Sequence, residues 1–170
     1  MEIRRALPDD APELGRFHVA AWRAAYRGII PDERLDLLDP VRRAGRFRES
    51  LEREAEETYL IEEDGYLLGF LTLGACRDED APGAGEIWGI YVHPTRLSRG
   101  IGTRLLEFGE DLLRRRGYGQ LKLWVLERND SSRRFYEARG YRLDGRRKEH
   151  PRGTGQYVVS YEKRVERRKG

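Results

Sequence analysis

Residues 85–116 read GEIWGIYVHPTRLSRGIGTRLLEFGEDLLRRR, and this stretch decides the fold. Its mostly apolar run over 87–92 predicts a strand, which a turn containing proline and arginine follows. A helix comes next, ended by Gly117, because apolar residues recur every three or four positions at Ile101, Leu105, Phe108 and Leu112. A strand, a glycine-bearing loop and a helix in succession place free backbone N–H groups and a positive dipole end at one point. The stretch therefore predicts an anion site.

The glycine loop around Gly100 and Gly102 lacks the residues of two common phosphate-binding motifs. The dinucleotide-binding fingerprint needs a third glycine at position 105, where this chain has leucine. The P-loop needs a lysine after its last glycine, whereas Gly102 is followed directly by Thr103. Two interpretations remain: a tight helix start without a ligand, or a pyrophosphate bound mainly by backbone N–H groups without a metal.

Outward from this stretch, helical patterns come early and strand patterns dominate after position 58. An Asp-Gly pair at 64–65 predicts a hairpin turn, and residues 77–85 predict a polar loop. Without repeats or a linker, residues 1–170 predict one α+β domain. Helices are expected over 8–27, 31–38, 41–53, 101–116 and 129–139, and strands over 3–6, 59–61, 66–73, 87–92, 121–126, 141–144 and 156–161.

Composition narrows the class of protein. No apolar run approaches the roughly 20 residues needed to cross a bilayer, so we expect a soluble, cytoplasmic protein with no membrane partner. A lone Cys76 excludes an intrachain disulfide, and His18, His93 and His150 show no ligand spacing, so no metal site is expected. The basic runs 146–148 and 164–169 are interleaved with glutamates, which favours a solvated face over nucleic-acid binding.

Two segments together resemble the GCN5-related N-acetyltransferase (GNAT) superfamily. Residues 86–113 are similar to its acyl-CoA-binding motif, Arg/Gln-x-x-Gly-x-Gly/Ala between a central strand and a helix. Residues 129–141, NDSSRRFYEARGY, resemble its second motif, Asn-x-x-Ala/Ser-x-x-Phe-Tyr-x-x-x-Gly-Phe/Tyr. The two motifs in this order are far more specific than either alone. The chain departs from the pattern at Leu97, where the family has arginine or glutamine, although Arg96 and Arg99 lie nearby.

This resemblance implies a GNAT-type acyl-CoA N-acyltransferase fold. Such a fold is α+β, with a central, mostly antiparallel mixed sheet of about seven strands, flanked by helices and splayed at the strand 87–92. The implied activity is transfer of the acetyl group of acetyl-CoA to a primary amine of a small molecule or peptide, by direct attack in a ternary complex. A catalytically inactive GNAT-fold module that binds CoA for regulation is the alternative. The identity of the acceptor is left open, and so is whether the protein forms a homodimer.

The resemblance also assigns cofactor-binding residues. The backbone of Tyr91 and Val92 would pair with the pantetheine arm, although ordinary sheet pairing is the alternative. Asn129 falls on a motif position that contacts the cofactor, and its alternative role is a helix cap. The full implied set is Tyr91, Val92, Leu97, Ser98, Arg99, Gly100, Ile101, Gly102, Thr103, Asn129 and Ser132.

Two catalytic residues follow from the same resemblance. Tyr136 corresponds to the tyrosine that protonates the departing CoA thiolate, with core packing beside its neighbour Phe135 as the alternative. Glu86 stands where the histone-modifying branch has a glutamate general base, with a solvated strand end as its alternative. His93 and Glu62 remain open as other bases.

Trp22 and Tyr26 are the candidate substrate-binding residues. They lie four positions apart in the WRAAYRGIIP segment, so one helix face presents both aromatic rings. Two aromatics at this spacing could stack an alkyl-ammonium acceptor. A plain core pair is the alternative.

Overall fold

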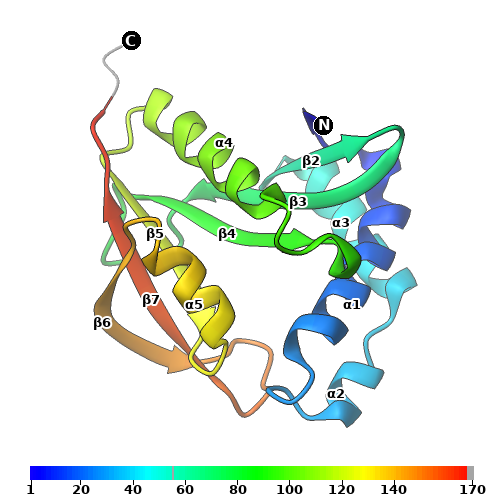
Figure 1. Cartoon of the computed structure of the whole chain (residues 1–170). Helices are drawn as coiled ribbons and strands as arrows, with labels where there is room; N and C mark the ends of the chain where they lie inside the picture. The colour runs from blue at the N-terminus through cyan, green and yellow to red at the C-terminus, as the bar shows by residue number, and fades with distance from the viewer. Residues whose placement is uncertain (55, 168–170) are drawn as a thin grey trace.

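The computed structural model describes residues 1–54 and 56–167, so the last residues of the second basic run, 168–169, lie outside the described part (Figure 1). The strands form one sheet in the order β1-β2-β3-β4-β5-β7-β6, in which β4 and β5 run parallel and all other neighbours run antiparallel. This confirms the predicted mixed, mostly antiparallel α+β fold of seven strands. The strands are β1 (Glu2–Arg5), β2 (Glu57–Glu63), β3 (Tyr66–Ala75), β4 (Gly85–Val92), β5 (Gln120–Leu126), β6 (Arg142–Glu149) and β7 (Tyr157–Arg164).

Helices cover both faces of this sheet. Side chains of successive strand residues point to opposite faces, so Leu60 packs among residues of α1 and α3 whereas Ile61 packs among those of α4. None of the described helices is both long and apolar enough to span a membrane. The helices are α1 (Ala11–Tyr26), α2 (Asp32–Asp36), α3 (Pro40–Arg53), α4 (Ile101–Arg115) and α5 (Asp130–Glu137), with short 3-10 turns η1 (Pro8–Asp10) and η2 (Pro94–Arg96).

The sheet is splayed between β4 and β5. These strands pair only at Gly85↔Leu121 and Glu86↔Lys122 within the described residues. Beyond that point β4 stays with β3, and β5 stays with β7 as far as Leu126. A β-bulge leaves Trp88 without a residue opposite it on β3, which bends β4 next to Gly89. The splay therefore begins where the sequence predicted it.

The segment expected to be a charged loop after position 144 is instead the second half of β6. Its residues pair with β7 as far as Glu149↔Tyr157, with a register shift between Leu143 and Arg147. β6 is an edge strand, and a charged edge strand keeps its polar side chains in water while its backbone pairs inward. The polar composition of residues 145–149 predicted a loop, because composition does not indicate that a strand pairs with a neighbour along only one of its edges.

Gly15 allows α1 and α3 to pack closely, and its substitution tests that contact. A Cβ there would lie 2.5 Å from the Pro40 carbonyl oxygen and 2.8 Å from the Ala44 Cβ. Because one neighbour is backbone, we expect Gly15→Ala to lower the free energy of unfolding by about 1–3 kcal/mol. Gly45→Ala is the control, since its Cβ would meet nothing within 4 Å; it should stabilise α3 by about 0.5–1 kcal/mol. Urea unfolding measures both changes, and an unchanged Gly15→Ala protein would contradict the tight contact.

Candidate active site

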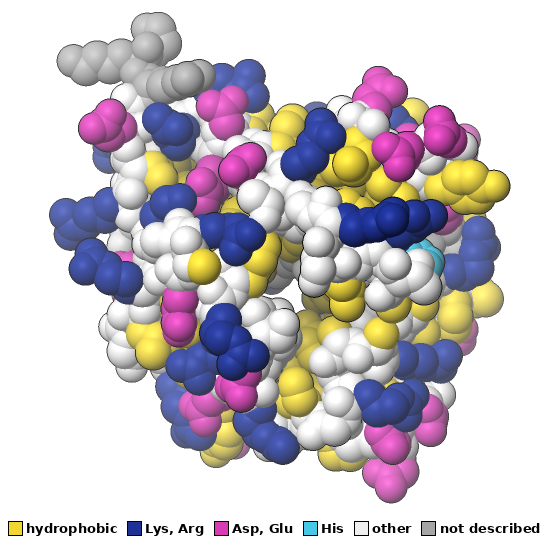
Figure 2. Space-filling model, viewed as in Figure 1, with side chains coloured by type: hydrophobic (Ala, Val, Ile, Leu, Met, Phe, Trp, Pro, Cys, Tyr) yellow, Lys and Arg dark blue, Asp and Glu magenta, His cyan; other side chains and the backbone are white. Residues whose placement is uncertain are grey.

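Two cavities adjoin the splay. One, of about 500 Å³, lies among α1, the end of β4, the start of α4 and α5. The other, of about 430 Å³, lies among α1, β4, β5 and the β6–β7 loop. We call them the loop cavity and the tryptophan cavity. Figure 2 shows the face of Figure 1 hollowed near its centre, where the loop cavity opens. The residues that line both cavities are Tyr26, Ile90, Tyr91, Asn129, Ser132 and Tyr136.

The loop cavity is suited to an anion. Gly100, with φ of 77°, is the N-cap of α4, so the free N–H groups of the first helical turn lie at the cavity wall. The described lining contains Arg96 and Arg139 and no carboxylate. A Cβ at Gly102 would lie 3.5 Å from the Phe135 ring and 3.7 Å from a Val92 methyl, both ordinary contact distances. Backbone donors, a dipole end and two guanidinium groups therefore converge here.

Most of the predicted cofactor residues line this cavity. Arg99 does not, and Leu97 has a side chain that is 61% exposed. Sequence reasoning missed Arg139, which donates hydrogen bonds to the Thr103 hydroxyl and, at 2.8 Å, to the Phe135 carbonyl. It occupies a variable position of the second motif, so the motif offered no signal for it. The predicted residues that line the loop cavity are Tyr91, Val92, Leu97, Ser98, Gly100, Ile101, Gly102, Thr103, Asn129 and Ser132.

The backbone of β4 offers a free donor at the splay. His93 donates its N–H to the Leu68 carbonyl at 2.8 Å, on the side of β3. Successive N–H groups of a strand point to opposite edges, so the Val92 N–H points away from β3, to the edge that β5 has left. That donor is available to a ligand.

Tyr136 lies where the two cavities meet. Its side chain is 9% exposed, with edge-to-face contacts to Phe135 and Tyr141. Burial raises the pKa of Tyr136, and the neighbouring Tyr91 raises it further. The phenol therefore stays protonated at neutral pH and can donate a proton to a group placed in either cavity.

Asn129 combines two of the features predicted for it. Its side-chain oxygen accepts a hydrogen bond from the Ser132 N–H at 3.2 Å, which caps α5. Its amide nitrogen donates to no described residue and lines both cavities. The cap uses the oxygen alone, so the NH₂ group can contact a ligand.

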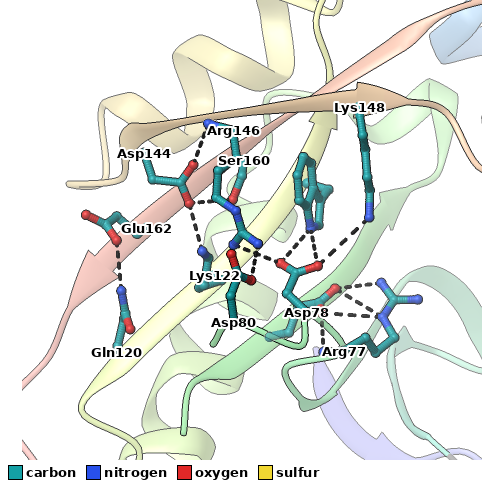
Figure 3. Close-up of polar contacts among 12 residues, drawn as sticks. Arg77, Asp78, Asp80, Gln120, Lys122, Asp144, Arg146, Lys148, Ser160 and Glu162 are labelled. Carbon is teal, nitrogen blue, oxygen red and sulfur yellow. Dashed lines mark hydrogen bonds and ion pairs between the residues drawn. The ribbon is translucent and has the colours of Figure 1, made fainter. Parts of the chain in front are cut away.

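Glu86 lies in the wall of the tryptophan cavity, but its carboxylate is already bound. Arg77 donates from Nη2 at 2.6 Å and from its backbone N–H at 3.0 Å (Figure 3). The side chain is 1% exposed, so the solvated strand end that the sequence allowed is wrong. Arg77 thus engages both oxygens of the carboxylate, and the base role stays a prediction. Of the other base candidates, Glu62 pairs with Arg4 and His93 caps η2, and neither lines this cavity.

The predicted aromatic pair is partly core. Trp22 is 6% exposed, lies 4.9 Å from the Tyr26 ring in an edge-to-face contact, and donates its indole N–H to the Tyr91 hydroxyl at 3.1 Å. Both rings still line the tryptophan cavity, together with Trp88 and Trp124, which the sequence analysis did not single out. Nothing in the sequence indicated that these two tryptophans share a cavity, because Trp88 lies on β4 and Trp124 on β5.

No group of three or more His, Cys, Asp or Glu side chains within residues 1–54 and 56–167 is arranged to hold a metal ion. The polar groups around the two cavities are backbone N–H groups, the Tyr136 phenol, the Asn129 amide and charged side chains.

Comparisons with known proteins agree with this architecture. Residues 19–141 match the acetyltransferase (GNAT) family. The uncharacterized N-acetyltransferase YuaI of Bacillus subtilis is 29% identical over 137 residues, which cover 80% of this chain and 77% of YuaI. The paiA N-acetyltransferase of Thermoplasma acidophilum, solved in complex with coenzyme A, superposes with a TM-score of 0.79 at 20% identity, covering 96% of this chain and 98% of that one. The structure of yncA of Salmonella typhimurium, solved with acetyl-CoA, has a TM-score of 0.72 at 19% identity, covering 100% and 96% of the two chains.

Proposed function

The chain belongs to the acetyltransferase (GNAT) family, and on that premise we propose that it transfers the acetyl group of acetyl-CoA to a primary amine by direct attack in a ternary complex. One observation carries the proposal: two cavities share the splayed strand β4 and the buried Tyr136 in their linings. A donor can occupy one cavity and an acceptor the other. Their reacting groups then meet at the splay, where proximity contributes much of the rate.

The loop cavity is the proposed site of acetyl-CoA. The first N–H groups of α4, with Arg96 and Arg139, would bind the pyrophosphate. The pantetheine arm would run along the open edge of β4, with the Val92 N–H directed at the thioester carbonyl. Solved family-like structures contain CoA or acetyl-CoA, which supports this choice of donor.

The chain's own groups have separable roles in this proposal. Acetyl-CoA supplies an activated thioester. The Tyr136 phenol donates its proton to the departing sulfur, and the tryptophan cavity orients the amine. Glu86 would accept the amine's proton only if Arg77 moved away or if the proton were passed to it through another group. We also retain the expectations of one cytoplasmic domain acting on small-molecule or peptide amines, without nucleic acid or membrane.

Release of free CoA thiol tests the function. We expect the purified protein with acetyl-CoA to release thiol in the presence of at least one class in a broad amine panel, with a product heavier by one acetyl group. Calorimetry of CoA binding is run in parallel. Binding without thiol release across the panel would select the regulatory alternative. Absence of CoA binding would contradict both.

A further inference from the structure

A third cavity, of about 380 Å³, adjoins the tryptophan cavity and is lined by arginines. It lies between α2, α3 and the β6–β7 loop, and it shares Trp22 and Arg152 with the tryptophan cavity and no residue with the loop cavity. Its described lining includes no aspartate or glutamate. We call it the arginine cavity. Its cationic residues are Arg34 on α2, Arg43 and Arg46 on α3, and Arg152 in the loop.

These four guanidinium groups lack counter-ions of their own. None forms a salt bridge or a side-chain hydrogen bond with any residue in the described ranges. By contrast, two other arginines on α3 are paired: Arg48 with Asp9 and Arg53 with Glu49. The chain as a whole contains 30 aspartates and glutamates, so the lack of acidic residues in the described lining is particular to this cavity.

Holding these charges together has a cost. Burial, followed by the positive charges of Arg152 and Arg46, lowers the pKa of Arg43 to about 10. Burial and the charge of Arg46 also lower the pKa of Arg152, although Tyr91, Tyr26 and Glu56 act in the opposite direction. Like charges repel, and an anion placed among them removes that repulsion while accepting charge-assisted hydrogen bonds.

Trp22 connects the arginine cavity to the proposed reaction centre. The Arg152 and Arg43 guanidinium groups lie 5.0 Å and 5.9 Å from the centre of its ring. Trp22 also contacts Tyr26, which lines both cavities at the splay. A small molecule bound among the arginines can therefore extend past Trp22 into the tryptophan cavity.

The tryptophan cavity offers little to a purely cationic acceptor. Its carboxylates are those of Asp78 and Glu86. Asp78 already accepts hydrogen bonds from the Trp124 indole at 3.0 Å and from Arg146 at 3.5 Å, and Lys148 lies 3.9 Å away (Figure 3). Glu86 is held by Arg77. A polyamine would thus lie near arginine side chains and find no unpaired carboxylate in the described lining of either cavity.

We propose that the acetyl acceptor is a small amine that also carries an oxyanion, and that the arginine cavity binds this oxyanion while the amine lies in the tryptophan cavity. The inference rests on the proposed function and names its substrate class. Carboxylate, phosphonate and sulfonate groups share the required chemistry, since each accepts hydrogen bonds from the planar guanidinium fork. The volume of about 380 Å³ is within the range of small-molecule sites.

A matched substrate panel provides the first test. Amino acids, aminoalkylphosphonates and aminoalkylsulfonates are each compared with a neutral partner that carries a carboxamide or hydroxyl in place of the oxyanion, and spermidine is included. We expect kcat/KM to be at least about tenfold higher for oxyanion-bearing amines, as a charge-assisted hydrogen bond predicts. The three series identify which oxyanion is preferred. Equal or faster acetylation of neutral amines or spermidine would overturn the inference and leave the proposed function intact.

Arginine variants provide the second test. Arg46→Gln and Arg152→Gln should each raise KM for the oxyanion acceptor about tenfold, with the KM for acetyl-CoA unchanged. Arg48→Gln removes the same charge from α3 outside the cavity and should change neither constant.

A binding measurement covers the case in which no amine is acetylated, which would contradict the proposed function itself. Inorganic phosphate is titrated into the CoA-saturated wild type, the Arg46→Gln/Arg152→Gln protein and Arg48→Gln. Phosphate affinity at least fivefold weaker in the double variant alone would support the anion site. Equal affinity in all three proteins would overturn it.

Discussion

Replacing Tyr136 by phenylalanine is expected to lower the kcat of acetyl transfer about a hundredfold while the protein stays folded. A positioned general acid contributes on the order of 100-fold or more to a rate, and Tyr136 lies where both cavities meet. Burial raises its pKa, so the proton is present at neutral pH. Phenylalanine keeps the ring contacts to Phe135 and Tyr141 and removes only the hydroxyl.

Tyr141→Phe is the matched control for this change. Tyr141 is 1% exposed, packs against Tyr136 and lines neither cavity. Its variant should keep the wild-type kcat. Steady-state thiol release measures both variants, and the melting temperature of each checks the fold. A Tyr136→Phe protein with unchanged kcat would count against the acid role.

Lys122→Met is expected to lower the free energy of unfolding by about 3–5 kcal/mol, because it leaves a buried carboxylate without its cation. The Lys122 ammonium lies 2.8 Å from Asp144, and the two side chains are 5% and 8% exposed (Figure 3). The Ser160 hydroxyl donates to the same carboxylate at 2.7 Å, so the contact ties β5, β7 and β6 together. Methionine has a similar length and cannot replace the charge.

The pH dependence checks the cause. Although burial opposes it, hydrogen bonds from Lys122 and Ser160 lower the pKa of Asp144. The pair's stabilisation is therefore present above the unfolded carboxyl pKa of about 3.9 and is lost as pH falls through the lower folded value. In Lys122→Met, protonation of Asp144 relieves the uncompensated charge, so the stability gap to wild type should narrow on acidification.

Two further variants separate the buried pair from ordinary ion pairs. Lys122→Met/Asp144→Leu should recover most of the lost stability, because both charges leave the interior together. Lys163→Met breaks the pair with Glu110, whose lysine is 25% exposed, and should cost about 1 kcal/mol or less. Guanidinium unfolding measures the series. Equal losses for Lys122→Met and Lys163→Met would contradict the special role of the buried contact.

The geometry of the loop cavity could be predicted in part from the sequence because it is local. The loop at Gly100 and Gly102 and the cap at Asn129 depend on residues a few positions apart, and their geometry follows from backbone preferences. The splay over 87–92 was implied by the family resemblance, and the bulge at Trp88 lies within that range.

The tryptophan and arginine cavities could not be predicted in the same way, because their residues come from separate parts of the chain. Glu86 stays a predicted base, but its partner Arg77 could not be foreseen, because Arg77 lies in a loop that only the folded sheet places next to β4. Arg152 meets Arg43 and Arg46 only once β6 extends as an edge strand and its loop returns to α3. Periodicity describes a helix face and carries no information on which distant charges will share a cavity.

The short seam between β4 and β5 has a mechanical consequence. Within the described residues, only two residue pairs join β4 to β5, so little backbone pairing holds the two halves of the sheet together beyond Glu86. A donor lying along β4 and bridged to α5 through Asn129 would fasten the halves to one another. Binding of the donor to the native state would then raise the free energy of unfolding. The concentration of acyl donor in the cell would therefore also affect the stability of the enzyme.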